Sequence, residues 1–185
     1  MILGERVRLR RIERADLPRF VAWLNDPSVR DHLALFHPMG LSDEERWFEG
    51  QAALEPVLRA LSIEARAADV RNEADDPEWT HIGGIGLHQV DWKNRTGELG
   101  IVIGEKGWWG RGYGTDAVRA LARWAFDELA LNRLWLRVYE DNARAQRAYE
   151  KVGFKAEGRL RQDRFHAGRY FDTVVMGLLR DELVR

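Results

Sequence analysis

Residues 108–117 are the part of this chain best suited to bind an anion. They read WWGRGYGTDA, with glycines at positions 110, 112 and 114. The hydrophobic run LGIVIG precedes them and the amphipathic run AVRALARWAFDEL follows, so the glycines are expected between a strand and the N-terminus of a helix. Backbone N–H groups that no side chain covers bind phosphate well at such a position, because the helix dipole adds to their hydrogen bonds. This segment therefore predicts a pyrophosphate site.

Two other phosphate-binding motifs fit the segment less well. A P-loop needs a lysine after its second glycine, and counting from Gly107 places Tyr113 there. The dinucleotide-binding pattern Gly-x-Gly-x-x-Ala matches residues 112–117, and Glu140 follows the next predicted strand, where a ribose partner would lie. However, residues 105–111 separate the motif from its strand, and only 45 residues follow Glu140 to complete a doubly wound sheet. A dinucleotide-binding domain is thus the weaker interpretation.

The elements that must position these residues form one mixed α/β domain over residues 1–185. The apolar pattern predicts strands at 5–12, 58–65, 81–90, 98–103 and 134–139, and a final hairpin after residue 153. It predicts helices at 17–26, 42–54 and 114–129 and after Asn142, with Asp16, Ser42 and Asn142 at their N-termini. Residues 81–103 read as an antiparallel hairpin, and residues 70–79 as a polar surface loop.

The composition narrows the class of protein. The net charge is −1, with 29 basic and 30 acidic residues, which gives no electrostatic basis for binding nucleic acid. The chain has no cysteine, so disulfide and thiol chemistry are excluded, and its five histidines are scattered without zinc-type spacing. No apolar run has the length of a signal peptide core or a membrane span. We expect a soluble, cytoplasmic protein without a metal site.

Residues 98–179 resemble the GNAT acyltransferase superfamily, above all its RimJ/RimL-like branch, and are also similar to spermidine acetyltransferases. The family's loop Gln/Arg-x-x-Gly-x-Gly/Ala corresponds to residues 109–114, with Trp109 in place of Gln or Arg. The family pattern Asn-x-x-Ala-x-x-x-Tyr-x-Lys-x-Gly-Phe matches residues 142–154. The resemblance implies a GNAT fold, an α/β domain whose mixed, mostly antiparallel sheet has about seven strands flanked by about four helices.

The resemblance also implies acetyl-CoA as the donor, and it assigns cofactor-binding residues. The strand at 98–103 would part at its end from the strand at 134–139, and the pantetheine arm would lie in the gap. The residues expected to contact the cofactor are Ile101, Val102 and Ile103 along the pantetheine, Trp109, Gly110, Arg111, Gly112, Tyr113, Gly114 and Thr115 at the pyrophosphate, and Asn142 and Arg147 nearby. Arg144 is a further candidate for a phosphate contact. Asn142 has the alternative role of a helix cap only.

Two residues are candidates for the proton transfers of an acetyl transfer to an amine. Tyr149 would protonate the departing thiolate, unless it is only a core aromatic. Glu98 would accept a proton through water, with a pKa raised by apolar strands, unless it is a solvated charge at a strand edge. Asp91, His88 and Glu157 are weaker alternatives for the base.

The expected function is transfer of an acetyl group from acetyl-CoA to a primary amine in a ternary complex. The amine would belong to a protein N-terminus or to a small molecule. We expect Trp23, Phe36, Trp47 and residues near His166 to line the acceptor pocket, and Glu44, Glu45 and Glu49 are available to a cationic acceptor. A different class of function, a non-catalytic acyl-CoA-binding or sensing module, remains open, and a homodimer is compatible with the resemblance.

Overall fold

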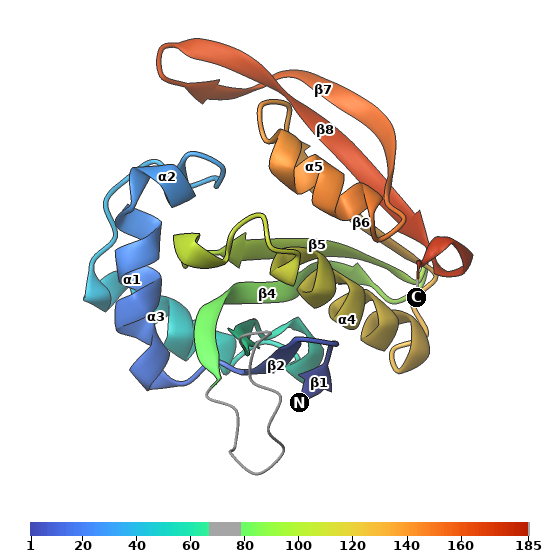
Figure 1. The fold of residues 1–185 in the computed structure, drawn as a ribbon, viewed down its shortest axis with the longest axis horizontal. Helices are drawn as coiled ribbons and strands as arrows, with labels where there is room; N and C mark the ends of the chain where they lie inside the picture. The colour runs from blue at the N-terminus through green and yellow to red at the C-terminus, as the bar shows by residue number, and fades with distance from the viewer. Residues whose placement is uncertain (67–78, 185) are drawn as a thin grey trace.

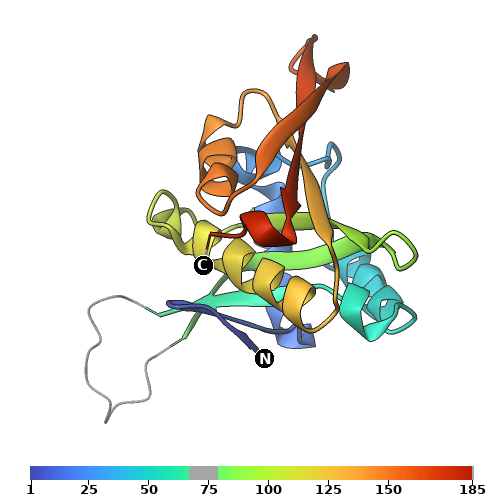
Figure 2. The same ribbon diagram turned by 90° about the vertical axis from the view of Figure 1, so that its right-hand side faces the viewer.

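The fold is known from a computed structural model that describes residues 1–66 and 79–184. The described residues form a single eight-stranded sheet in the order β1-β2-β3-β4-β5-β6-β8-β7 (Figures 1 and 2). Its strands are β1 (Ile2–Leu3), β2 (Val7–Arg11), β3 (Leu61–Ala65), β4 (Thr80–Asp91), β5 (Thr96–Ile103), β6 (Arg133–Tyr139), β7 (Lys155–His166) and β8 (Arg169–Leu179). The surface loop predicted at 70–79 falls almost wholly outside the described residues.

The pairing of the strands confirms a mixed, mostly antiparallel sheet. Neighbouring strands are antiparallel except β5 and β6, the one parallel pair among the described strands. The hairpin predicted at 81–103 is the β4–β5 pair, and the predicted final hairpin is β7–β8. A doubly wound parallel sheet is absent from the described residues, so the dinucleotide-binding interpretation is wrong. The expected seven strands become eight, because the two-residue strand β1 was not predicted.

Helices lie on both faces of the sheet. The described helices are α1 (Leu17–Asn25), α2 (Pro27–Arg30), α3 (Leu41–Gln51), α4 (Tyr113–Asp127) and α5 (Ala143–Glu150). On one face, the buried side of α4 packs with Leu99 and Ile101 of β5 in the main core. On the other, Phe20 of α1 lies against Gly84 of β4, and it shares a smaller apolar cluster with Val102. Alternate residues of β4 and β5 therefore face α4 and α1.

Several predicted helix boundaries are confirmed, and others need correction. Asn142 caps α5 as expected, since its Oδ1 accepts a hydrogen bond from the Ala145 N–H at 3.1 Å. Helix α3 instead begins after Gly40, whose N–H donates to Asp43 at 2.9 Å, so Ser42 is not its cap. The strand expected from residue 58 starts at residue 61, because residues 56–58 form a short 3-10 helix.

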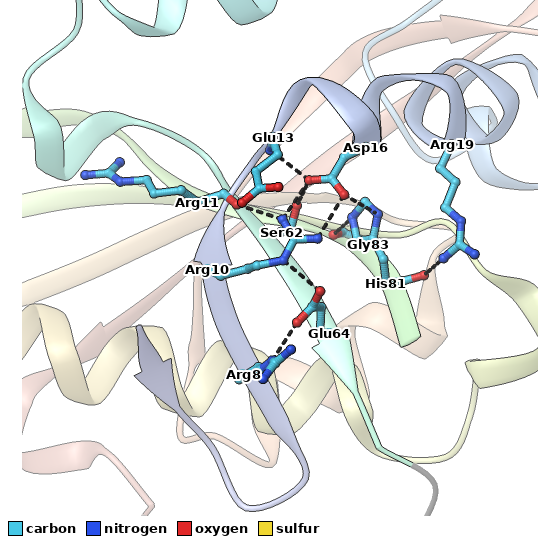
Figure 3. A network of polar contacts seen from close by, with 10 residues as sticks. All are labelled: Arg8, Arg10, Arg11, Glu13, Asp16, Arg19, Ser62, Glu64, His81 and Gly83. Atoms are coloured by element: carbon cyan, nitrogen blue, oxygen red, sulfur yellow. Dashed lines mark hydrogen bonds and ion pairs between the residues drawn. The ribbon is translucent and has the colours of Figure 1, made fainter. Parts of the chain in front are cut away.

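Asp16 precedes α1 as predicted, but its carboxylate does not cap that helix. It accepts hydrogen bonds from Arg10 at 2.7 and 2.9 Å, from the Ser62 hydroxyl at 3.1 Å and from the Glu13 N–H at 2.8 Å (Figure 3). Arg10 also donates to Glu64 at 2.7 Å. The correction has a physical reason, since a buried carboxylate beside an arginine is better satisfied by that cation than by the free N–H groups of a helix.

The same polar network links the sheet to α1. Nδ1 of His81 lies 3.5 Å from Asp16, and its Nε2 lies 3.0 Å from the Gly83 carbonyl oxygen. Phe20 and Trp23 of α1 pack edge-on against the His81 ring. Burial lowers the pKa of His81, so the ring is neutral in this apolar setting. The network thus fixes α1 over β2, β3 and β4.

The network predicts acid sensitivity through Asp16. Burial alone would raise the pKa of Asp16, but the hydrogen bonds from Arg10 and from the Glu13 N–H outweigh it and lower the pKa to about 2. This stabilisation is complete above the unfolded-state pKa of about 3.9 and is lost as the pH falls toward the folded-state value. The lowered pKa of Asp16 contributes roughly 2.5 kcal/mol to the free energy of unfolding at neutral pH, and about half of this contribution should be lost between pH 5 and pH 3.

Urea unfolding of the wild type and Asp16→Asn at pH 7, 5 and 3 measures this loss. The difference in unfolding free energy between the two proteins should narrow at pH 3. The control Glu128→Gln, an exposed carboxylate at the end of α4, should match the wild type at each pH. A difference that stays constant from pH 7 to pH 3 would show that Asp16 does not carry this dependence.

Candidate active site

The sheet opens between β5 and β6. These parallel strands pair only at Thr96 with Arg133, Gly97 with Leu134 and Glu98 with Trp135. Beyond that point β5 continues along β4, and β6 continues along β8 through Tyr139. The resemblance implied such a parting at the end of the strand, and the structure places it directly after Glu98. The gap leaves one edge of each strand without its neighbour.

The register shows which backbone groups of β5 face this gap. The Gly104 N–H donates to the Ile82 carbonyl at 2.9 Å, so Val102, two residues earlier, also turns its backbone groups toward β4. Ile101 and Ile103 consequently point theirs toward β6. The Ile103 carbonyl accepts a hydrogen bond from the Trp109 indole at 2.7 Å. Both backbone groups of Ile101 and the N–H of Ile103 are thus left for a ligand in the gap, which argues against the predicted role of Val102.

The predicted pyrophosphate loop lies at the N-terminus of α4. Gly110 has φ +69° and Gly112 has φ +87°, the left-handed region that favours glycine. Gly112 is the N-cap of the 15-residue helix, and the first helical hydrogen bond runs from the Asp116 N–H to the Gly112 carbonyl at 3.0 Å. Gly114 lies near the end of β5, because a Cβ built on it would be 3.6 Å from Cγ1 of Ile103. The N–H groups of residues 113–115 therefore end beside the gap without helical acceptors.

Contacts with the turn between β1 and β2 hold this loop in shape. The Tyr113 side chain is buried under the guanidinium of Arg6, 4.5 Å from the ring centre, so Tyr113 offers a ligand only its backbone. Arg6 also donates to the Arg111 carbonyl at 2.9 Å. The Asp116 carboxylate accepts from the N–H groups of residues 5–7 at 2.8 to 3.1 Å. Sequence reasoning missed Arg6 and Asp116, although an acid in the first turn of a helix is a signal for such a contact.

Helix α5 brings the second predicted motif to the opposite side of the gap. The Tyr149 ring packs against the main core, with its centre 6.0 Å from that of Phe154. Its hydroxyl has no hydrogen-bond partner among the described residues. Burial raises the pKa of Tyr149 to about 12, so the phenol keeps its proton at neutral pH. Such a group can donate a proton but cannot serve as a base.

The arginines proposed for the phosphates differ in their placement. The Arg144 guanidinium lies 3.8 Å from the ring centre of Trp109, which joins α5 to the pyrophosphate loop. Arg111 is exposed, 5.8 Å from the Trp108 ring. Arg147 is exposed and its side chain has no partner among the described residues. The structure thus places Arg144, rather than Arg147, against the loop.

Glu98 lies where β5 and β6 begin to part. Its side chain is buried, and its Oε1 accepts a hydrogen bond from Nε of Arg137 at 3.0 Å. His88 is its partner across the β4–β5 pair. The other two candidate bases, Asp91 and Glu157, each interact with a polar neighbour of their own.

A cavity of about 360 Å³ lies between the segment that follows α2 and the β7–β8 hairpin. Phe36, Tyr139, Arg164 and His166 are among its lining residues. Phe36 and His166 therefore lie together as expected for an acceptor pocket. Trp23 does not join them, because it is buried in the apolar cluster beneath α1.

Among the residues that the structure describes, no three His, Asp or Glu side chains converge as metal ligands. No described helix is both long and apolar enough to cross a membrane.

A parted parallel strand pair, with a glycine-rich helix N-terminus at its open end, defines the class of acyl-CoA-dependent acyltransferases. The family model described as an acetyltransferase (GNAT) domain matches residues 6–155. The chain belongs to this GNAT acetyltransferase family and is an N-acetyltransferase, which confirms the family and the fold predicted from the sequence.

Known proteins with similar sequences or folds agree with this membership. The chain is 26% identical over 181 residues to the uncharacterized N-acetyltransferase p20 of Bacillus licheniformis, covering 96% of this chain and 95% of that protein. It is 29% identical over 115 residues to a spermidine N(1)-acetyltransferase of Vibrio cholerae, covering 62% and 66%. The fold is similar to the crystal structure of the Vibrio cholerae spermidine N-acetyltransferase in complex with CoA and spermine. The TM-score is 0.81 at 22% identity, over 97% of this chain and 98% of that one.

The loop geometry predicts which glycines are needed for binding. Valine cannot easily adopt the φ of +87° at Gly112, so Gly112→Val should distort the loop and weaken acetyl-CoA binding at least about tenfold. Gly114 has no positive φ, and its Cβ would make only an ordinary contact, so Gly114→Val tests crowding at the site more directly.

Titration of tryptophan emission with acetyl-CoA measures both variants, since Trp108 and Trp109 adjoin the loop. Gly107→Ala is the matched control, because a Cβ there meets no atom within 4 Å. Melting curves separate lost binding from lost fold. Normal affinity in both valine variants would mean that these glycines do not bind the pyrophosphate.

Proposed function

We propose that this chain transfers an acetyl group from acetyl-CoA to the primary amine of a small molecule, by direct attack within a ternary complex. The observation that carries the proposal is the parting of β5 and β6 beside the N-terminus of α4. A gap with unpaired backbone groups on one wall suits the amides of pantetheine, and the helix N-terminus suits its pyrophosphate. No other opening in the described sheet combines these two features.

In this proposal the cofactor-binding residues have separate tasks. Ile101 and Ile103 hydrogen-bond the pantetheine through their backbone, while the N–H groups of residues 110–115 bind the pyrophosphate. Arg144, held on Trp109, adds positive charge beside that loop. Asn142 keeps its side-chain NH2 group free to donate to the cofactor, because only its oxygen is used to cap α5.

Tyr149 is the proposed general acid. The leaving thiolate needs a proton as the C–S bond breaks, and the partly buried, neutral phenol of Tyr149 on α5 can supply one. Glu98 is placed at the start of the gap, but its carboxylate is already held by Arg137. Its proposed contribution is therefore electrostatic, as a fixed negative charge near the reacting amine.

A small amine is the favoured acceptor, because relatives that share about half or more of this chain act, by name, on spermidine. The three glutamates that the sequence offered for a cationic acceptor, Glu44, Glu45 and Glu49, are either paired with an arginine or buried. Glu45 and Glu49 both pair with Arg14. Glu44 is buried, and burial raises its pKa. An acceptor with fewer charges than a polyamine suits this chain better.

Release of free CoA from acetyl-CoA, followed with a panel of amines, tests the proposed function. The panel contains spermidine, a monoamine, an amino sugar and a short peptide with a free N-terminus. Turnover with a small amine supports the proposal, and turnover with the peptide alone would replace the acceptor class. Saturable acetyl-CoA binding without amine-dependent release would instead identify a non-catalytic module.

Removing the phenol proton should slow the chemical step. Tyr149→Phe keeps the ring that packs against Phe154, so the fold and acetyl-CoA affinity should change little. We expect kcat to fall on the order of 10²-fold, because general acid catalysis contributes effects of that size. Steady-state kinetics with the best amine of the panel provide the measurement. A loss below about threefold at every pH would make Tyr149 a packing residue only.

A further inference from the structure

The His88 side chain lies across the neighbouring strand at Gly100. A Cβ built on Gly100 would lie 3.0 Å from Cδ2 of His88 and 2.6 Å from its Nε2, and the second distance is shorter than real Cβ atoms make. Any residue other than glycine at position 100 would therefore push the imidazole away. The missing side chain lets the ring of a β4 residue cross over β5, toward the side on which β6 lies.

The backbone of β4 is distorted just after His88. Gln89 has φ +44°, an uncommon value for a residue other than glycine, and the β4–β5 register shifts between His88 and Asp91. Such a bulge re-aims side chains and is common beside functional sites.

The position of His88 along the sheet coincides with the start of the gap. His88 pairs with Glu98, and Glu98 with Trp135 forms the last pair before β5 and β6 separate. His88 lies on the same face of the sheet as Gly84 and Val102, because residues two apart along a strand point the same way. That face packs against α1, and the opposite face is covered by α4. The His88 side chain is exposed, so it can exchange protons with water.

We propose that His88 is the general base that takes a proton from the acceptor amine; this rests on the proposed function. The ammonium gives a proton to Nε2 of the neutral imidazole, and the free amine bonds to the thioester carbon while the C–S bond breaks. The thiolate takes the Tyr149 proton, and the surplus proton on the new amide nitrogen returns to the phenolate through water. The imidazolium then releases its proton to solvent, so each turnover releases one proton.

The charged neighbours favour this division of roles. Glu98 on β5 and Arg137 on β6 are the charged groups on the strands beside His88 at this level. Arg137 already donates to Glu98, so this carboxylate is held in an ion pair. That fixed anion can in turn stabilise an imidazolium on the adjacent strand. Glu98 is thus a positioning residue and His88 the group that reacts.

Kinetics of His88→Gln with the best amine of the panel test the assignment. We expect kcat/KM to fall about 10²-fold near neutral pH, with acetyl-CoA affinity unchanged in the emission titration. A general base must be unprotonated before it reacts, so kcat/KM of the wild type should decline as the pH falls. That decline should disappear in His88→Gln and persist in Glu98→Gln. Imidazole added to His88→Ala should raise kcat/KM of this variant at least tenfold, which would not happen if His88 only packed against the sheet.

A second pair of variants leaves His88 itself in place. Gly100→Ala should displace the ring and lower kcat/KM, because the new Cβ would overlap Nε2. Gly158→Ala is its matched control, since it is also in a strand but its Cβ meets no atom within 4 Å. The control should keep the wild-type rate.

The outcomes separate this inference from the proposed function. If the wild type releases no CoA with any amine, the proposed function is wrong. If the wild type turns over and His88→Gln matches it in kcat/KM and in pH profile, only the role of His88 is overturned. The role of His88 is also overturned if His88→Gln is slow but its kcat/KM still declines at low pH, and imidazole does not restore the rate of His88→Ala.

Discussion

The broken pairing between two parallel strands is the constraint on which the rest of this structure depends. β5 and β6 share three residue pairs and then separate, although each keeps its other neighbour. An isolated strand edge would carry unsatisfied backbone groups, and these are costly unless water, a side chain or a ligand meets them. One of them is met within the chain, where the Trp109 indole binds the Ile103 carbonyl. The others face the space that the acyl donor is proposed to occupy.

Both ends of the gap are built from irregular backbone. At the open end, two glycines with positive φ turn the chain into α4, and Arg6 and Asp116 hold that turn against the N-terminal strands. At the closed end, the bulge after His88 and the bare backbone of Gly100 admit a ring over the sheet. The regular strands between them act as a rigid frame, so the reacting groups are held with little loss of entropy on binding.

The sequence was informative wherever a signal is local. The glycine loop with its helix, the cap at Asn142 and the two hairpins each depend on residues a few positions apart, and each was predicted. The features that it could not provide depend on contacts between distant segments. Asp16 looked like a helix cap because it directly precedes α1. Its actual partners, Arg10 and Ser62, lie on two strands and could not be identified before those strands were paired. The direction of the Val102 backbone groups and the position of His88 follow from the register of β4 against β5, which residue types alone do not determine. Glycines paired across two strands, Gly86 with Gly100, are the one signal that could have drawn attention to that surface.

The contact between Asp116 and residues 5–7 spans about 110 positions of the chain. During synthesis the N-terminal strands emerge first, yet they have no carboxylate to bind until the start of α4 has been made. The glycine-rich turn before α4 can therefore reach its final shape only late in folding, since such long-range contacts form slowly. The same dependence ties residues 5–7 to the predicted cofactor loop. A change in this turn would act on a loop that is remote in sequence but adjacent in space.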